Sequence, residues 1–220
     1  MYIGEIIAQD TYAIEQHDSL RFALQKMNDL QAPQLPVVND SNYLGLIEQD
    51  EILPFIDATA SINQLKDNFK LLFQFENQHI YDALQFMSIH KLTILPILDA
   101  SLKYIGVITQ ADLLIAVNQL LGNSADGAIL VLELAQADNA LAQVAHIIES
   151  ENIRILNTAI YAIPDSDRLE MTIKVDRRNI TALVATLWRY DYIVKATFND
   201  NQDHADTDER YAMLMNYLNL

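Results

Sequence analysis

The sequence contains no cysteine, which excludes disulfide bonds and thiolate metal sites. Glycine and proline are also scarce, at 5 residues each, whereas 51% of the 220 residues are hydrophobic. This balance is typical of a compact globular chain. The sequence has no apolar run of about 18 residues, which a membrane-spanning helix requires, and it has no basic and apolar secretory signal at the start. We therefore expect a cytoplasmic protein without a membrane partner.

Basic residues are scarce as well. The chain has 14 Lys and Arg residues against 30 Asp and Glu residues, for a net charge of −16. Such a chain repels phosphate backbones and anionic lipids, so nucleic acid and membrane surfaces are excluded as main partners. Residues 1–64 hold 10 acidic and only 2 basic residues. This segment is therefore the least suited to an anionic ligand.

The first 122 residues contain an internal repeat. Three sequence blocks recur in the same order, 60 or 61 residues later: ALQKM and ALQFM, LPVV and LPIL, YLGLI and YIGVI. Such a recurrence indicates two copies of one structural unit. The copies are residues 1–60 and 61–122.

The pattern of each copy predicts the same elements in the same order: a helix, an apolar strand, a turn, a second strand and a second helix. The first helices carry apolar residues at i, i+3, i+4 and i+7, namely Leu20, Ala23, Leu24 and Met27, then Ile80, Ala83, Leu84 and Met87. The strands are apolar throughout, as expected of strands covered on both faces. Neither copy can bury these strands alone, so the two should pack into one α/β module.

Beyond the turn-rich segment 122–127 the pattern changes. Alternating strand and helix signals predict the order βαββαβ over residues 127–198, which is the ferredoxin-like α+β arrangement. The expected elements are a strand at 128–134, a helix with the stripe Leu141, Val144, Ala145 and Ile148, strands at 153–163 and 169–175, a helix with the stripe Ile180, Leu183, Val184 and Leu187, and a strand at 192–198.

The last 22 residues form a further segment. Residues 199–210 are polar and acidic, as in a flexible linker. Four apolar residues at helical spacing then predict a short amphipathic helix: Tyr211, Leu214, Met215 and Leu218. Such a helix needs an apolar surface to pack against. That surface belongs either to this protein or its twin subunit, or to a different protein partner.

These blocks resemble the cystathionine-β-synthase (CBS) domain, which occurs in tandem pairs of βαββα units. The resemblance rests on the helix, the Leu-Pro-Val-Val or Leu-Pro-Ile-Leu strand, the turn and the Gly-hydrophobic-Ile-Thr-x-x-Asp-Leu-Leu segment, and it covers residues 1–122. Residues 127–198 look like an ACT domain. The combination resembles CBS–ACT regulatory proteins linked to acetoin utilisation, which implies a non-catalytic, homodimeric regulator of a protein partner.

Thr109 and Asp112 in the second copy have two interpretations. In one, they cap a helix, because a Thr accepts an amide hydrogen bond at a helix start and a carboxylate suits the first turn. In the other, implied by the resemblance, they hold the ribose of an adenosyl ligand such as AMP, ADP, ATP or S-adenosylmethionine. No cofactor is required in either.

The first copy departs from this pattern, since Glu48 and Glu51 stand where the second has Thr109 and Asp112. Glu51 can still reach a ribose, but Glu48 adds a carboxylate that opposes a phosphate by about 1–4 kcal/mol at about 4 Å. We therefore expect one ligand site per chain, in the second copy.

Two groups of residues complete the predicted site. His90 and Lys91, together with Lys103, are candidates for holding the phosphates, although ordinary surface charge explains all three. Ile94 and Pro96, with Leu95 between them, would form the floor under an adenine, and they are core residues in either case.

Other chemistry has little support in the sequence. In the ACT-like part, Asp138 is expected to cap a helix, and an amino-acid site is not favoured because the usual Gly is missing near Asn139. The five histidines show no metal-ligand spacing, and no catalytic motif occurs, so we expect neither a metal nor an enzyme. The alternative to a sensor is a ligand-free homodimeric adaptor that uses the CBS fold as a scaffold.

Overall fold

The computed structural model describes residues 1–7, 11–55, 60–135 and 140–198. It divides into two compact units, Met1–Leu120 (unit 1) and Leu121–Leu220 (unit 2). The predicted C-terminal linker and helix, and the predicted cap Asp138, lie outside the described residues. Within the described part, no helix is both long and apolar enough to cross a bilayer.

Unit 1 contains the same order of elements twice. The first repeat has β1 (Ile14–Glu15), α1 (Leu20–Leu30), β2 (Gln34–Asn39), β3 (Asn42–Glu48) and α2 (Gln49–Ile52). The second repeat has β4 (Gln74–Phe75), α3 (Ile80–His90), β5 (Ile94–Leu98), β6 (Tyr104–Thr109) and α4 (Gln110–Leu120). Short 3-10 helices lie outside these elements, at Ile3–Glu5 (η1), Leu53–Phe55 (η2) and Ile62–Asn68 (η3).

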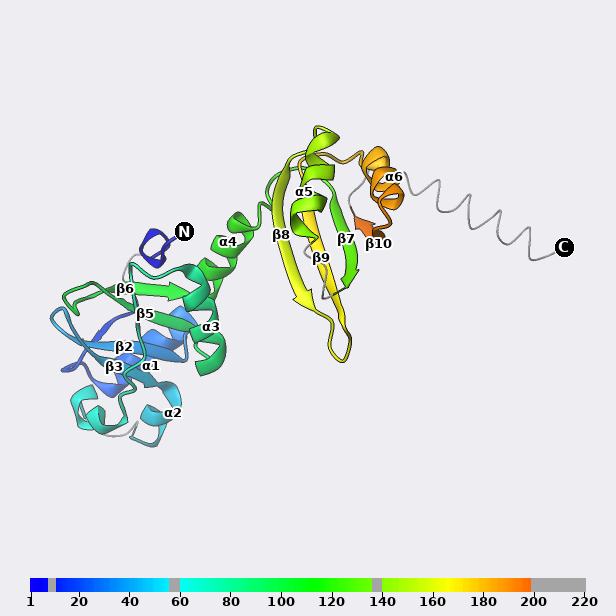
Figure 1. Ribbon diagram of the computed structural model, residues 1–220. Coiled ribbons are helices and arrows are strands. Elements are labelled where there is room, and N and C mark those ends of the chain that lie inside the picture. The colour runs from blue at the N-terminus through cyan, green and yellow to red at the C-terminus, as the bar shows by residue number, and fades with distance from the viewer. Residues whose placement is uncertain (8–10, 56–59, 136–139, 199–220) are drawn as a thin grey trace. The chain divides into compact units, whose positions relative to one another are not determined.

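Each repeat builds a three-stranded sheet, β1-β2-β3 or β4-β5-β6. The first strand pairs in parallel with the second, which pairs antiparallel with the third. The two antiparallel hairpins lie beside each other (Figure 1). The middle strands β2 and β5 are buried along almost their whole length, as expected of apolar strands covered on both faces.

The two first helices differ in how much of their apolar stripe they bury. In α1 all four stripe residues are buried. In α3 the buried residues are Ile80, Ala83 and Met87, whereas Leu84 is 45% exposed. The predicted helix is present, but Leu84 does not join its buried face. Leu84 faces outward beside the exposed Leu114 of α4, so α3 and α4 carry an apolar surface at this place.

Unit 2 has the element order β7 (Ile129–Ala135), α5 (Leu141–Ser150), β8 (Ile155–Ala162), β9 (Arg168–Val175), α6 (Thr181–Arg189) and β10 (Ile193–Phe198). The sheet order is β10-β7-β9-β8, and every pair is antiparallel. The predicted strands and helices agree with these bounds within two residues. Figure 1 shows α5 lying along the sheet of this unit. A separate apolar core forms between the helices and the sheet.

The predicted stripe of α5 is only partly correct. Val144 and Ile148 are buried as expected, but Leu141 is largely exposed, and Ile147 is buried in its place. The helix therefore packs with a slightly rotated face, which is centred on Val144, Ile147 and Ile148.

The link between α4 and β7 depends on a glycine. Gly127 has φ +153°, and a Cβ at this position would lie 1.8 Å from the carbonyl oxygen of Val175. The Val175 amide donates to the Ala128 carbonyl at 3.0 Å, and the Ala128 amide donates to the Arg177 carbonyl at 2.8 Å. Because the backbone is held on both sides of the Val175 carbonyl, that carbonyl has little room to move. Gly122, only five residues earlier, has φ +64°, and its nearest neighbouring atom would be an ordinary 3.5 Å away.

We predict that Gly127→Ala lowers the unfolding free energy of unit 2 by about 2–3 kcal/mol, because the methyl group forces the backbone apart. Gly122→Ala is the matched control and should cost only about 1–2 kcal/mol, the ordinary penalty for a left-handed residue. Urea unfolding followed by the fluorescence of Trp188, the single tryptophan, reports on this unit. Equal losses in the two variants would contradict the steric argument.

Candidate functional site

Thr109 and Asp112 lie where β6 ends and α4 begins, and they bind each other. The Thr109 hydroxyl donates to Oδ2 of Asp112 at 2.6 Å, and the Thr109 amide donates to the same oxygen at 3.0 Å. In return, the Asp112 amide donates to Oγ1 of Thr109 at 3.1 Å. This is the reciprocal capping arrangement, which satisfies donors at the helix start. All three bonds use Oδ2 or Oγ1, and none of them uses Oδ1 of Asp112.

The strand beside this pair carries the predicted apolar floor. Ile94 is the register partner of Thr109, and both Ile94 and Pro96 are buried in β5. The start of α4 is fixed to the same region, because the Gln110 amide donates to the Thr93 carbonyl at 3.1 Å. The structure thus brings Ile94, Thr109 and Asp112 to one end of the β5–β6 hairpin.

The predicted cationic residues are placed less directly. His90 is the last residue of α3, and its ring lies 4.4 Å from that of Phe86. Lys91 ends the same helix with φ +53° and an exposed side chain. Both come shortly before Ile94, but no contact given for the described residues joins their side chains to Thr109 or Asp112. Lys103 bonds to Asn42 at 2.6 Å beside the other end of β6, so it is not part of this site.

The corresponding positions of the first repeat have different partners. Lys70 donates to Oε2 of Glu48 at 2.6 Å, and Gln34 donates to Oε1 of Glu48 at 3.0 Å. Asn68 donates to Glu51. The Gln34 side chain also accepts from the Thr93 amide at 3.1 Å, so it joins the two repeats. The lysine ammonium, with the Gln34 hydrogen bond, holds the pKa of Glu48 below its ordinary value although partial burial opposes this.

Sequence reasoning missed Lys70, Asn68 and Gln34. For Lys70 and Asn68 there was no signal, because the segment between the repeats, which joins the last helix of the first repeat to β4 of the second, has no hydrophobic period. For Gln34 there was a signal, since it is a polar residue directly before the apolar run Leu35–Val38 and stands where the second repeat has Ile94. Gln34 is only 6% exposed, which explains why its amide needs partners on both sides.

Unit 1 also carries an apolar groove between α3 and α4, with a volume of about 430 Å³. It is lined by Leu84, Met87, Ser88, Gln110, Leu113, Leu114 and Val117. The exposed leucines on its rim, Leu84 and Leu114, continue into other exposed apolar residues of these two helices, Ile89 and Ile115. An apolar surface of this kind is suited to another protein surface rather than to a charged ligand.

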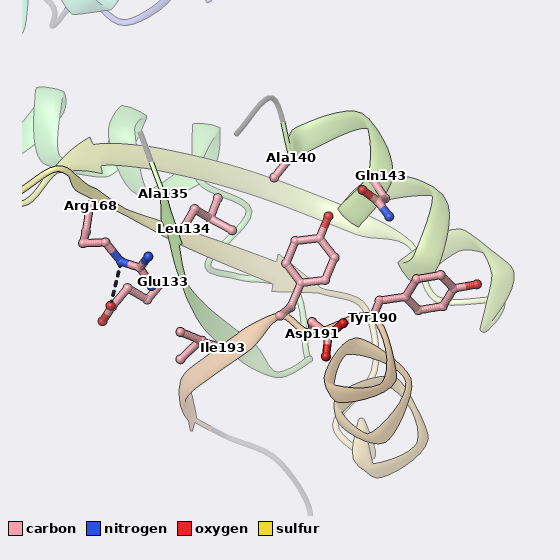
Figure 2. Close-up of a pocket in the computed structure, with 10 residues that line it drawn as sticks. Glu133, Leu134, Ala135, Ala140, Gln143, Arg168, Tyr190, Asp191 and Ile193 are labelled. Carbon is pink, nitrogen blue, oxygen red and sulfur yellow. Dashed lines mark hydrogen bonds and ion pairs between the residues drawn. The ribbon is translucent and has the colours of Figure 1, made fainter. Parts of the chain in front are cut away.

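Unit 2 has a more polar pocket of about 470 Å³ at the end of β7 (Figure 2). The guanidinium of Arg168 and the carboxylate of Glu133 lie 3.0 Å apart in its wall. Asp191, at φ +62°, lies beside Tyr190 where the chain enters β10. Because Arg168 is already neutralised by Glu133, the described lining has a net charge of −1. Among the described residues of the whole chain, no group of three or more potential ligands is suited to a metal ion.

Comparison with known proteins places unit 1. The family model of the CBS domain matches residues 3–58 and 75–119. Unit 1 is a tandem pair of CBS domains. The two matches correspond to the two repeats in the structure, and together they leave unit 2 unassigned.

Several solved structures are similar to part of this chain. A CBS domain pair/ACT domain protein from Thermotoga maritima is 22% identical, with a TM-score of 0.50, over 55% of this chain and 99% of that chain. A putative acetoin utilization protein from Vibrio cholerae is 19% identical over 57% and 97%, with a TM-score of 0.48. CBSX2, crystallised in complex with AMP, is 19% identical over 54% and 97%, with a TM-score of 0.46. At these identities the first match supports the fold and nothing beyond it.

We predict that Glu48→Gln lowers stability at neutral pH by about 1 kcal/mol, because it removes the charge from a hydrogen-bonded ion pair that is partly exposed. Since the folded-state pKa of Glu48 is depressed, its contribution is complete above the ordinary value of 4.5 and disappears as the pH falls through the folded-state pKa. The difference in unfolding free energy between the native protein and the variant, measured by urea unfolding, should therefore shrink below about pH 4.5. Asp50→Asn, which removes a neighbouring exposed carboxylate, should show no such narrowing.

Proposed function

We propose that this protein is a regulatory sensor of an adenine nucleotide or a related adenosyl compound, bound at Thr109 and Asp112. The observation that carries the proposal is the Thr109–Asp112 pair in the second CBS repeat. Its mutual bonds use Oδ2 of the carboxylate, so Oδ1 can accept from a ribose hydroxyl without breaking the helix cap. The resemblance to ligand-binding CBS pairs implies the same use of these two positions.

The surroundings of the pair support an adenosyl ligand. Ile94 and Pro96 provide a buried apolar wall beside Thr109, which suits the face of a purine. Lys91 is exposed and lies three residues before Ile94, so it is the cation nearest to this apolar wall in the sequence and the candidate for a phosphate contact. We propose Lys91 and His90 as phosphate contacts, and Thr109 and Asp112 as ribose contacts. No catalytic residue is part of this proposal, because binding itself is the function.

A ligand changes the activity of a partner only if it binds one arrangement of the protein more tightly than another. A difference of about 1–3 kcal/mol in binding free energy is typical of such coupling. We propose that the responding part is unit 2, whose element order βαββαβ and sheet order β10-β7-β9-β8 support an ACT-like domain of the ferredoxin-like class. The regulated partner would be a protein.

We further propose a homodimer that forms through the α3–α4 face of unit 1. Leu114 is 71% exposed there, and it lines the apolar groove together with Leu84. A second copy of the chain offers the same apolar surface, so a two-fold axis would pair like with like. The burial of these leucines would account for apolar side chains that the monomer leaves in water.

The nucleotide proposal predicts a thermal shift. AMP, ADP, ATP or S-adenosylmethionine at about 100 times its dissociation constant should add about 2.7 kcal/mol of stability, which is several degrees for a chain of this size. Asp112→Ala should abolish the shift, since the carboxylate that contacts the ribose is lost.

Asp82→Ala is the control variant, because it removes a helix cap without removing a proposed ligand contact. Asp82 accepts from the His79 amide at 3.1 Å in the equivalent capping box of α3. This variant should lose about 1 kcal/mol of stability but retain the ligand shift. If none of the four ligands stabilises the native protein, the ligand-free adaptor becomes the better description and Thr109 and Asp112 are a helix cap.

The dimer proposal predicts that Leu114→Asp converts a dimer into a folded monomer in sedimentation velocity. The substitution places a charge in an apolar interface but hardly affects the monomer, in which Leu114 is exposed. Ile160→Asp, at an exposed apolar residue of unit 2, is the control and should leave the mass unchanged. A native protein that sediments as a monomer would refute the proposed interface.

A further inference from the structure

The two repeats of unit 1 differ in what lies against their third strand. In the first repeat, Lys70 forms an antiparallel bridge with Leu46 of β3, and the two residues exchange backbone hydrogen bonds of 2.8 and 2.9 Å. The approach is very close, because a Cβ on Gly45 would lie 2.7 Å from Cβ of Phe69. The segment Asn68–Lys70 is therefore fixed against the end of the first-repeat hairpin.

Two side chains of this segment bind the first-repeat carboxylates. Lys70 pairs with Glu48 at 2.6 Å, and Asn68 donates to Glu51. Glu48 and Glu51 are the counterparts of Thr109 and Asp112 in the second repeat. The two positions that would contact a ligand are thus each bound to a donor from the chain itself. In the second repeat the same two positions bind each other instead.

The charges fit this arrangement. Residues 1–64 contain only two basic residues, Arg21 and Lys26, and Lys26 donates to the Ala13 carbonyl at 2.5 Å. The cation at the end of the first-repeat hairpin is Lys70, which comes from the segment between the repeats. Because Glu48 neutralises it, Lys70 has no net charge to offer a phosphate. The lowered pKa of Glu48 agrees with a carboxylate that stays ionised in this pair.

We infer that the first CBS repeat is closed by a clasp of its own residues, Lys70–Glu48 and Asn68–Glu51, and that Glu48 is the residue that keeps this repeat from binding a nucleotide. The clasp occupies both ligand-contacting positions and ties the inter-repeat segment to them. This inference rests on the proposed function, since it assigns the Thr109 and Asp112 positions to ligand contact. It goes further by identifying a second, latent nucleotide site whose phosphate contact is Lys70.

The test is to give the first repeat the residues of the second. The variant Glu48→Thr/Glu51→Asp releases Lys70 and restores the shorter polar pair. Isothermal titration with AMP should give one site per native chain and two sites per variant chain. Glu51→Gln is the matched control, because it leaves the Lys70–Glu48 pair intact and its amide oxygen still accepts from Asn68, and it should stay at one site.

Two further measurements separate the parts of the inference. Adding Lys70→Gln to the double variant should weaken the binding of AMP at the new site about tenfold. The binding of adenosine, which has no phosphate, should stay unchanged. Hydrogen exchange of the amides in Asn68–Lys70 should accelerate at least tenfold in Glu48→Thr/Glu51→Asp without any ligand, and circular dichroism checks that this variant is folded.

The outcomes distinguish this inference from the proposed function. One site in both the native chain and the double variant overturns the clasp and leaves the second-repeat sensor intact. No site in the native chain and one in the double variant overturns the sensor and supports the clasp. No binding by either protein overturns both. Unchanged exchange at Asn68–Lys70 in the double variant also overturns the clasp, whatever the titrations give.

Discussion

The N-terminal unit depends on the burial of two β-hairpins that are apolar on both faces. Strands β2 and β5 have no polar side to turn toward water, so each repeat exposes a sheet surface that the other must cover. Specific contacts fix how they meet: the rings of Tyr43 and Tyr104 stack with centroids 6.3 Å apart, and Gln34 bonds to Thr93. The capping boxes of α3 and α4, the apolar groove and the Lys70–Glu48 ion pair depend on this association, because they lie at the ends or on the covering helices of the two hairpins.

Much of this architecture could be read from the sequence because hydrophobic period and burial are directly linked. The duplicated blocks predicted two equivalent units, and the alternation of apolar and polar residues from Leu169 to Val175 predicted a strand. The failures have a physical origin as well. Leu84 fits the helical stripe yet is 45% exposed, since the hydrophobic period alone cannot tell a residue that faces the core from one that faces away from it.

The candidate site was predictable only in part. Thr109 and Asp112 were found because a capping box has a fixed spacing, and their mutual bonds have the expected form. Lys70 and Asn68 were missed, because their partners are 22 and 17 residues away in the sequence and are set by the path of the chain between the repeats. Polar side chains that meet through tertiary structure leave no periodic signal, so the difference between the two repeats could be noticed in Glu48 and Glu51 but not explained.

The buried amide of Gln34 gives the pair of repeats a direction. An amide has one donating end and one accepting end, and here the donating end faces Glu48 while the accepting end faces Thr93. Turning the amide over would set its NH₂ group against the Thr93 amide hydrogen and its oxygen against a carboxylate, two repulsive contacts at once. Glu48 and the Thr93 amide therefore favour the same orientation of this interior dipole, and the Gln34 side chain joins the end of β3 in the first repeat to the residue before β5 in the second. Two repeats with the same fold are therefore joined by a contact that is not symmetric, because the second repeat has the apolar Ile94 where the first has Gln34.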